Sequence, residues 1–244
     1  MNDVLAVLNG HGTVRDFESD YQLTDEQVEA ILCAAKQAPS WMNGQAYSIV
    51  VFEGESKEKL AQLLLKETIN TKNSETIANA NLLLLFNMDL SLYDLSADFT
   101  DEVEPLLISS VDAALAMENA LVAAESLGLG TCVIGNLRAS ARDICQTYGY
   151  PDYVFPLVGL AIGKPSKEIR VKPRIPNSAN VFRAEELPKQ VDSQDLADYN
   201  QQLADFAAKT GYQSSDWQQR FMDYYGNKKY VQTTKEELKK QKLF

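Results

Sequence analysis

The chain has 244 residues, of which 45% are hydrophobic and 23% are charged, and 34 acidic residues against 23 basic ones give a net charge of −11. These fractions are typical of a globular protein and exclude a wholly disordered or collagen-like chain. The negative charge argues against a nucleic-acid or anionic-membrane partner, because both require clustered lysine and arginine.

Two local features qualify this picture. The last segment, 227–244, has six lysines and two glutamates, and it is predicted to be a solvated helix. Cys33, Cys132 and Cys145 form no C-x-x-C pair and lie among apolar neighbours, which predicts buried, reduced thiols.

The first residues show no basic region followed by an apolar run, so no signal peptide is expected and the predicted location is the cytoplasm.

The first half of the chain alternates between helical and strand patterns. A short helix is predicted over 3–9. A second helix begins at Thr24, which forms a capping box with Gln27, and ends before Pro39. The β-branched and aromatic run 46–53 predicts a strand, and a helix is expected over 56–66.

The second half contains the most apolar segments. The runs 81–88 and 154–162 predict strands buried on both faces. Between them, 89–104 has six acids and no base, which indicates a solvent-facing segment, either a lid or an irregular helix. The helix predicted over 106–127 is apolar on two faces and contains Asp112, Glu118 and Glu125, which favours a domain-centre or subunit-interface helix over a membrane span.

The remaining elements complete an α/β or α+β pattern. A short strand is predicted over 131–134, then a turn at Gly135 and Asn136, and a helix over 138–148 that ends at Gly149. Prolines interrupt the segment that follows position 164. Peripheral helices are expected over 187–206 and 217–225.

Several common catalytic motifs are missing. A single histidine makes a histidine-based metal site improbable, and no metal site is predicted. There is no G-x-S-x-G elbow, no G-x-G-x-x-G fingerprint and no G-x-x-x-x-G-K-[ST] loop. A hydrolytic triad, a usual dinucleotide-binding turn and a P-loop are therefore poorly supported.

Two basic motifs could hold an anion. In GHGTVR, at 10–15, His11, Thr13 and Arg15 fall within five residues, so this turn could offer donors to an anion or could be a solvated surface turn. In VKPRIP, at 171–176, Lys172 and Arg174 are two residues apart in an extended segment. They could form a paired cationic site or belong to a rigid, solvated loop.

Two further motifs lie at strand edges. The segment 38–45, APSWMNGQ, joins a helix to a strand, and its hydroxyl and amide groups suit the polar edge of a planar heterocycle or an ordinary turn. The segment 120–135 ends in closely spaced glycines that permit close backbone approach, although helix capping by Gly128 also accounts for part of the pattern.

With these four segments in order, the chain resembles the nitroreductase family of flavoproteins. It is most similar to the NADPH-dependent branch that includes oxygen-insensitive nitroreductases and FMN-dependent NADPH oxidoreductases. The matching pieces are GHGTVRDF at 10–17, APSWMNGQAYSIVVF at 38–52, VDAALAMENALVAAESLGLGTCVIGNLR at 111–138, and PLVGLAIGKP with VKPRIP within 156–176.

The resemblance implies an α+β fold, an α-β-α sandwich with a central, mostly antiparallel sheet, in an intertwined homodimer with two FMN sites at the interface. It implies an FMN-binding core over 1–180, with 89–104 as a possible lid. A helical C-terminal extension over 181–244 would pack on the core or on the partner subunit.

The resemblance also implies which residues hold FMN. The phosphate, the ribityl chain and the N1–O2 edge would be held by His11, Gly12, Thr13, Arg15, Lys172 and Arg174. The isoalloxazine would lie along Ser40, Trp41, Asn43 and Gln45, partly from the second subunit, and the N5–O4 edge along Ile134, Gly135 and Asn136. Gly12 stands where this branch often has arginine, and Asn136 where it usually has glycine.

The implied activity is a two-electron, ping-pong NAD(P)H oxidoreductase that acts on nitroaromatics, quinones or free flavin. No side chain acts as nucleophile or general base, and Arg15 or Lys172 would stabilise the negative charge of the reduced flavin. Arg183 and Arg220 are both candidates for the NADPH contact. A flavin-binding sensor without turnover and a different flavin-dependent reduction on the same fold remain alternatives.

Overall fold

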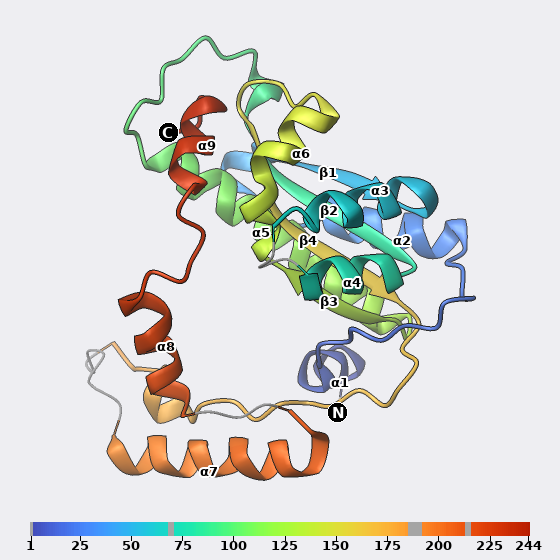
Figure 1. Ribbon diagram of the computed structural model, residues 1–244, viewed down its shortest axis with the longest axis vertical. Coiled ribbons are helices and arrows are strands. Elements are labelled where there is room, and N and C mark those ends of the chain that lie inside the picture. The colour runs from blue at the N-terminus through green and yellow to red at the C-terminus, as the bar shows by residue number, and fades with distance from the viewer. Residues whose placement is uncertain (1, 68–70, 185–191, 213–215) are drawn as a thin grey trace. The chain divides into compact units, whose positions relative to one another are not determined.

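The computed structural model describes residues 2–67, 71–184, 192–212 and 216–244 (Figure 1). Two compact units make up the chain: one runs up to Ile169 and includes Val231–Phe244, and the other is Arg170–Tyr230. The expected domain boundary near residue 180 stays a prediction, because compact units of contact need not fold independently.

An antiparallel sheet of four strands lies at the centre of the first unit, in the order β1-β2-β4-β3 (Figure 1). All eight residues of β2 are buried, as its continuous apolar sequence predicts. The strand predictions over 46–53, 81–88, 131–134 and 154–162 are confirmed within one or two residues. The strands are β1 (Tyr47–Phe52), β2 (Leu82–Asp89), β3 (Gly130–Ile134) and β4 (Val154–Gly163).

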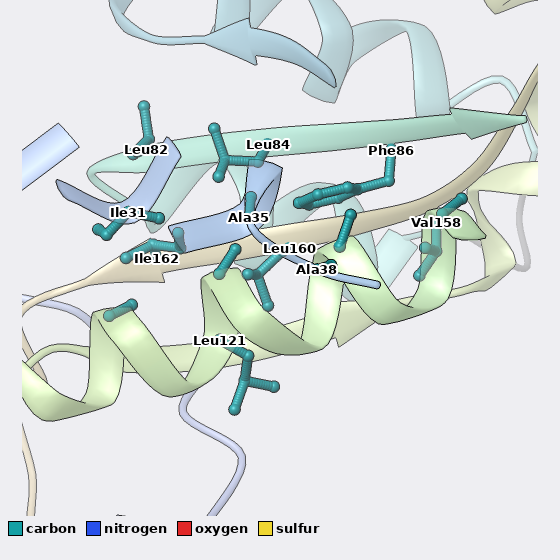
Figure 2. Packing of buried hydrophobic residues seen from close by; sticks show 14 of the residues in the cluster. Ile31, Ala35, Ala38, Leu82, Leu84, Phe86, Leu121, Val158, Leu160 and Ile162 are labelled. Carbon is teal, nitrogen blue, oxygen red and sulfur yellow. The ribbon is translucent and has the colours of Figure 1, made fainter. Parts of the chain in front are cut away.

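Helices cover both faces of the sheet. Leu82, Leu84 and Phe86 of β2 pack against α2 (Asp25–Lys36) and α5 (Glu104–Ser126), as Figure 2 shows. The alternate residues Leu83 and Leu85 pack on the opposite face, against α3 (Gly54–Leu64), α4 (Thr71–Asn79) and α6 (Ala141–Tyr148). This alternation confirms the predicted α-β-α sandwich of the α+β class.

The helix α5 has two unlike sides. Ala113, Ala116, Ala120 and Ala124 are fully buried, and their small side chains let the helix lie close to the sheet. On another side, apolar residues such as Val111 are exposed. By length and composition alone α5 could cross a membrane, but its alanine side packs in the sheet core, as the core-helix prediction requires.

Local sequence signals set the ends of several helices. The Thr24 side chain accepts a hydrogen bond from the Gln27 amide, and the Gln27 side chain accepts one from the Thr24 amide, so the predicted capping box of α2 is confirmed. Gly149 ends α6 in the left-handed conformation, with φ of 63°. A short 3-10 helix, Asn136–Ser140, precedes α6, and α1 spans Asp3–Gly10.

The C-terminal tail is not the solvated helix that its charge predicts. The helix α9 (Thr234–Lys240) and the residues after it bury Leu238 and Leu243 against Phe155 of β4. Glu237, which is 3% exposed, accepts hydrogen bonds from the Arg142 guanidinium at 2.7 and 2.8 Å. The prediction of a solvated tail was wrong because Glu237, Leu238 and Leu243 pack on the core, while the lysines of the same segment face solvent.

The prediction of three buried thiols is also corrected. Cys132 and Cys145 are buried, but Cys33 is exposed. On α2, the fully buried residues are Ile31 and Ala35, and Cys33 lies midway between them on the outer side of the helix. Its apolar sequence neighbours therefore do not report its exposure.

The acidic segment 89–104 begins at the last residue of β2 and ends at the first residue of α5, and between them it is irregular except for the 3-10 turn Ser91–Tyr93. Its acids are mostly exposed, but Phe99 packs edge-on against Tyr153 with ring centroids 5.8 Å apart. The Tyr153 hydroxyl also donates to the Ala97 carbonyl at 2.8 Å. The segment is thus fastened to the core at its middle, and its role as a lid stays a prediction.

The second unit contains α7 (Ser193–Thr210) and α8 (Trp217–Gly226). Tyr199 and Trp217 pack edge to face between these helices, with ring centroids 6.0 Å apart. Both helices were expected from the sequence, although residues 187–191 of the first prediction lie outside the described part of the chain.

Candidate functional site

The first predicted segment, around His11–Arg15, runs beside the beginning of β3. Thr13 bridges Thr131 in parallel, and the Val14 amide donates to the Thr131 carbonyl at 2.8 Å. A Cβ at Gly130 would lie 2.6 Å from Val14 Cγ2, so only glycine lets the two segments approach this closely. The glycine-rich end of the 120–135 motif therefore holds the His11 turn in place.

Glu125, near the end of α5, fixes the orientation of His11. Its Oε1 lies 2.8 Å from His11 Nδ1 and accepts a hydrogen bond from Thr131 Oγ1 at 2.7 Å. The Glu125 side chain is only 9% exposed, against 30% for His11. With Nδ1 engaged in this contact, Nε2 is the ring nitrogen left for a ligand.

Arg15 presents a free cation. Its side chain is exposed, and no hydrogen bond or ion pair ties it to any residue in the described part of the chain. The neighbouring Asp16 instead pairs with Lys167 at 2.8 Å. An unpaired guanidinium beside a histidine and a threonine is a donor set that suits a phosphate.

The predicted segment 38–45 continues from the end of α2 into a tight loop before β1. Residues 40–46, called the 40–46 loop, include the 3-10 turn Trp41–Asn43. Met42, Asn43 and Gln45 have φ values of 50°, 57° and 56°, which are left-handed conformations that cost non-glycine residues about 1 kcal/mol or more each. Such a loop keeps its shape only where its surroundings offset the strain.

Asp112 of α5 bonds to both ends of this loop. Its Oδ1 accepts a hydrogen bond from the Trp41 amide at 3.0 Å, and its Oδ2 accepts one from the Ala46 amide at 3.1 Å. The residue is 1% exposed. Hydrogen bonds to a charged group stabilise by about 1.5–3 kcal/mol each, which is enough to offset the strain of the loop.

Two further contacts hold the middle of the loop. Ser40 Oγ accepts a hydrogen bond from the Gln45 amide at 3.1 Å. The Tyr93 hydroxyl, from the acidic segment, donates to the Gly44 carbonyl at 2.7 Å. Burial, followed by the negative charge of Asp112, raises the pKa of Tyr93, so this hydroxyl remains protonated and available as a donor.

The loop borders an apolar hollow of about 360 Å³ along α5. Trp41 is 58% exposed at its edge, and Leu107 and Val111 are 52% and 55% exposed in its wall. Exposed apolar side chains gathered in this way are typical of a surface that a ligand or another chain covers. The full lining is Pro39, Ser40, Trp41, Glu104, Leu107, Ile108, Val111, Asp112 and Leu115.

The third predicted segment lies at the far end of β3. Ile134 is buried in the face of the sheet that α3 and α6 cover, while Gly135 and Asn136 are partly exposed where the strand passes into a 3-10 helix. Arg138 reaches back to the Leu157 carbonyl at 2.9 Å and lies 3.4 Å from where a Gly135 Cβ would be. Gly135 has no side chain, so at this position the strand end offers only its backbone groups.

Lys172 and Arg174 belong to the second unit, Arg170–Tyr230. The Lys172 ammonium lies 4.2 Å from the centre of the Tyr212 ring, and Arg174 donates to the Lys172 carbonyl at 2.8 Å. Arg220 donates to the Tyr212 hydroxyl at 3.4 Å. Burial raises the pKa of Tyr212, but hydrogen bonding to Arg220 and the charges of Lys172 and Arg220 outweigh it and lower the pKa. Lys172 and Arg220 thus meet at one aromatic ring.

Within one chain, the structure does not bring the first two segments together. The His11 turn contacts Glu125 and the 40–46 loop contacts Asp112. These two acids are 13 residues apart on α5, or about 20 Å at 1.5 Å per residue. Ile134 to Asn136 lie at the opposite end of β3 from the His11 turn.

Sequence reasoning missed the residues that hold the predicted site residues in position. Asp112 and Glu125 were read only as polar breaks in an apolar helix, and Tyr212 was not singled out. For Asp112 and Glu125 the available signal was the residue type, since an acid on an otherwise apolar helix is rarely buried without a partner. Nothing in the local pattern shows that their partners Trp41, Ala46 and His11 lie 66 to 114 residues away in the sequence.

The residues present fit a planar cofactor with a phosphate tail. An unpaired arginine, a fixed histidine and a threonine hydroxyl can receive the phosphate, and the rigid loop beside an apolar hollow can receive a ring system. The strand end at Gly135 can offer backbone groups to a heterocycle edge.

Fold and site together define an α+β sandwich protein whose candidate ligand-binding segments lie at strand ends and contact one long helix. The model of the "Nitroreductase family" matches residues 8–164, and that of the "Nitroreductase family, C-terminal domain" matches residues 172–244. The chain therefore belongs to the nitroreductase family, in the branch that its sequence motifs indicate.

Relatives match over nearly the whole chain. The "FMN reductase [NAD(P)H]" of Bacillus subtilis is 32% identical, over 99% of this chain and 98% of the relative. The "Oxygen-insensitive NADPH nitroreductase" of Salmonella typhimurium is 33% identical, over 86% and 85%. Among solved structures, the NADPH:FMN oxidoreductase from Vibrio harveyi in complex with NAD⁺ matches with a TM-score of 0.85 at 28% identity, over 99% and 98% of the two chains.

Proposed function

We propose that this protein is an NAD(P)H-dependent FMN oxidoreductase. The observation that carries the proposal is the match of residues 8–164 to the nitroreductase family, since this range contains the His11 turn, the 40–46 loop and the end of β3. Relatives at 32% and 33% identity are named for flavin or nitro-group reduction with NAD(P)H.

In this proposal the basic side chains hold the phosphate of FMN. His11, Thr13 and Arg15 donate to the phosphate and ribityl chain, with Gly12 allowing close backbone approach, and Lys172 and Arg174 add positive charge. Arg15 and Lys172 also place a cation near the flavin N1–O2 edge, where negative charge develops on reduction. The exposed Arg15, which has no partner among the described residues, supports this assignment.

The polar loop and the strand end position the ring system. Ser40, Trp41, Asn43 and Gln45 would lie along the isoalloxazine, and backbone groups of Ile134, Gly135 and Asn136 would contact its N5–O4 edge. The strained conformation of the loop supports this role, because residues held in left-handed conformations are often found where a site must be rigid before its ligand arrives.

When bound, FMN supplies hydride acceptance at N5 from the nicotinamide and delivery of two electrons to a second substrate. In this proposal one pocket receives both substrates in turn. Ping-pong kinetics are therefore expected, with nitroaromatics, quinones or free flavin as acceptors. A cytoplasmic location, where NAD(P)H is available, agrees with this activity.

We also propose that two copies of the chain form the site as a homodimer. The His11 turn and the 40–46 loop of one chain are about 20 Å apart along α5, so a partner's loop could complete the site beside the His11 turn. The exposed Leu107, Val111 and Trp41 supply an apolar surface for this contact. Packing of the C-terminal extension on the core or on the partner stays part of the same prediction.

The test is a visible spectrum of the purified full chain, followed by anaerobic titration with NADPH or NADH. The proposal expects bound FMN that bleaches on reduction and recovers when a nitroaromatic, a quinone or free FMN is added. Parallel lines in double-reciprocal plots would support the ping-pong scheme. Protein that takes up no FMN overturns the proposal, and bound FMN that neither nucleotide reduces indicates a flavin-binding sensor instead.

A further inference from the structure

Among the described residues, Asp112 is the one whose side chain accepts hydrogen bonds from both ends of the 40–46 loop. It is 1% exposed, and its two carboxylate oxygens accept hydrogen bonds from two separate amides, Trp41 at 3.0 Å and Ala46 at 3.1 Å. No lysine or arginine in the described ranges pairs with it, so backbone amides alone compensate the buried charge. A buried carboxylate with this arrangement is costly unless both amides stay in position.

The loop between these amides has a shape that its own sequence does not favour. Met42, Asn43 and Gln45 are all left-handed, and Trp41 and Met42 are 58% and 80% exposed, so packing contributes little to holding them. The Ser40 hydroxyl and the Tyr93 hydroxyl add one hydrogen bond each. The two bonds to Asp112 are the only charge-assisted ones on the loop among the residues the structure describes.

We propose that Asp112 is the positioning residue that holds Ser40, Asn43 and Gln45 in the conformation in which they receive the flavin ring. In this proposal Asp112 acts through the loop backbone, since it is 1% exposed and both of its carboxylate oxygens accept hydrogen bonds from loop amides. This inference rests on the proposed FMN-binding function. It goes beyond that function because it assigns the geometry of the ring-contacting loop to a single carboxylate on the long helix.

The matched test compares Asp112→Asn with Ser109→Ala. The amide keeps the shape of Asp112, but its NH₂ replaces one acceptor and faces a backbone N–H, so one hydrogen bond is lost and the charge is removed. Ser109 lies one turn earlier on the same helix and is fully buried, and its hydroxyl donates to two carbonyls of its own helix, those of Pro105 and Leu106, and to no other group in the described ranges. Both variants are made in the full chain with Trp217→Phe, which leaves Trp41 as the sole tryptophan.

Three measurements report on the loop. In the flavin-free parent protein, amide hydrogen exchange at Trp41 and Ala46 should be slower than at Met42, and Asp112→Asn should remove this protection. The fluorescence anisotropy of Trp41 should fall in Asp112→Asn and not in Ser109→Ala. The FMN dissociation constant should rise about tenfold in Asp112→Asn only, as expected for one lost charge-assisted hydrogen bond.

The outcomes are distinct. Equal exchange at Trp41, Ala46 and Met42 in the parent overturns the inference, and so does an Asp112→Asn variant with unchanged anisotropy and FMN affinity. An Asp112→Asn variant that loses its fold also overturns it, since Asp112 would then support the core rather than the loop. A parent protein that binds no FMN overturns the proposed function, whereas the exchange and anisotropy results still decide whether Asp112 fixes the loop.

Discussion

At the scale of single residues, Arg15 and Lys167 are both exposed cations of the same unit, but they differ in what they contact. Lys167 pairs with Asp16 at 2.8 Å, whereas Arg15 pairs with nothing in the described chain. We expect Arg15→Ala to weaken FMN binding by about tenfold to a hundredfold, since it removes charge-assisted hydrogen bonds to a phosphate. The free energy of unfolding of the flavin-free protein should change by less than about 0.5 kcal/mol.

Flavin fluorescence titration and urea denaturation measure the two effects separately. Lys167→Ala is the matched control, because it removes an exposed cation that already has an acidic partner, and surface ion pairs of this kind contribute about 1 kcal/mol or less. An Arg15→Ala variant with wild-type FMN affinity would show that the His11 turn is only a solvated surface turn.

Cys145 gives a pH prediction at the same scale. Burial, followed by the negative charge of Glu237, raises the pKa of this thiol from 9.0 to about 12. Between pH 9 and pH 12 the unfolded chain therefore releases a proton that the folded chain retains. Because the folded state then binds more protons than the unfolded state, the free energy of unfolding should fall as the pH rises through this range.

Urea midpoints at pH 7, 9 and 10 check this expectation. Cys145→Ala should show a smaller loss between pH 9 and pH 10 than the parent protein. Some loss should remain, because burial also raises the pKa of Tyr148 and Tyr150, and these phenols act with the same sign. Identical pH slopes in the parent and in Cys145→Ala would contradict the prediction.

The limits of sequence reasoning are also clear at the residue scale. Residue types pointed to His11 and Arg15, because donors within five residues of one another form a local pattern. The partners Glu125, which is largely buried, and Asp112, which is buried, could not be predicted, because each bonds to a residue 66 to 114 positions away. Cys33 was misjudged for a related reason: the side of a helix that faces solvent depends on what packs against it.

At the scale of elements, the sequence predicted those whose pattern follows from burial alone. β2 was found because all eight of its residues are buried, so its sequence is a continuous apolar run. α2 was found because its capping box and apolar spacing are local. The 40–46 loop has no such pattern, since its left-handed residues are imposed by contacts with α5 and with Tyr93.

The C-terminal segment that contains α9 shows that the net charge of an element does not reveal whether part of it is buried. Leu243 is fully buried in a cluster with Ala46, Met88 and Phe155, so the C-terminal end closes the core beside the 40–46 loop. We expect Leu243→Ala to lower the free energy of unfolding by about 2–5 kcal/mol, as for other buried leucines. Urea denaturation measures the change.

The control for this substitution is Leu65→Ala, because Leu65 is 50% exposed at the end of α3. At Leu65 the same loss of side-chain atoms should lower the free energy of unfolding by less than about 1 kcal/mol. If Leu243→Ala is no more destabilising than Leu65→Ala, then α9 does not pack on the core in solution and the original expectation of a solvated tail would be restored.

At the scale of the whole molecule, the order of the motifs along the chain identified the family. The resemblance to that family implies a dimer with a shared site, whereas the structure describes a single chain. The composition excluded classes of partner, and the apolar sides of α5 indicated a core or interface helix. The arrangement of one chain leaves the His11 turn and the 40–46 loop about 20 Å apart along α5. A sequence pattern does not reveal such a separation, because it depends on where on the helix each segment docks.

The proposed homodimer leads to a prediction about Leu107. This residue is 52% exposed in the wall of the hollow beside the 40–46 loop. We expect Leu107→Glu to leave the fold of each chain intact but to shift the protein from dimer to monomer, because a carboxylate would be buried without a partner in an apolar interface. Sedimentation velocity measures the mass, and circular dichroism checks the fold.

Loss of the dimer should also remove bound FMN, because the partner's loop would no longer complete the site. Leu65→Glu is the matched control: it introduces the same charge at a similarly exposed leucine on the opposite side of the sheet, and it should leave both mass and flavin content unchanged. A Leu107→Glu variant that stays dimeric would move the interface away from this side of α5. A monomeric variant that retains FMN with wild-type affinity would show that each chain binds its cofactor alone, and the apolar hollow would then belong to the substrate rather than to the partner.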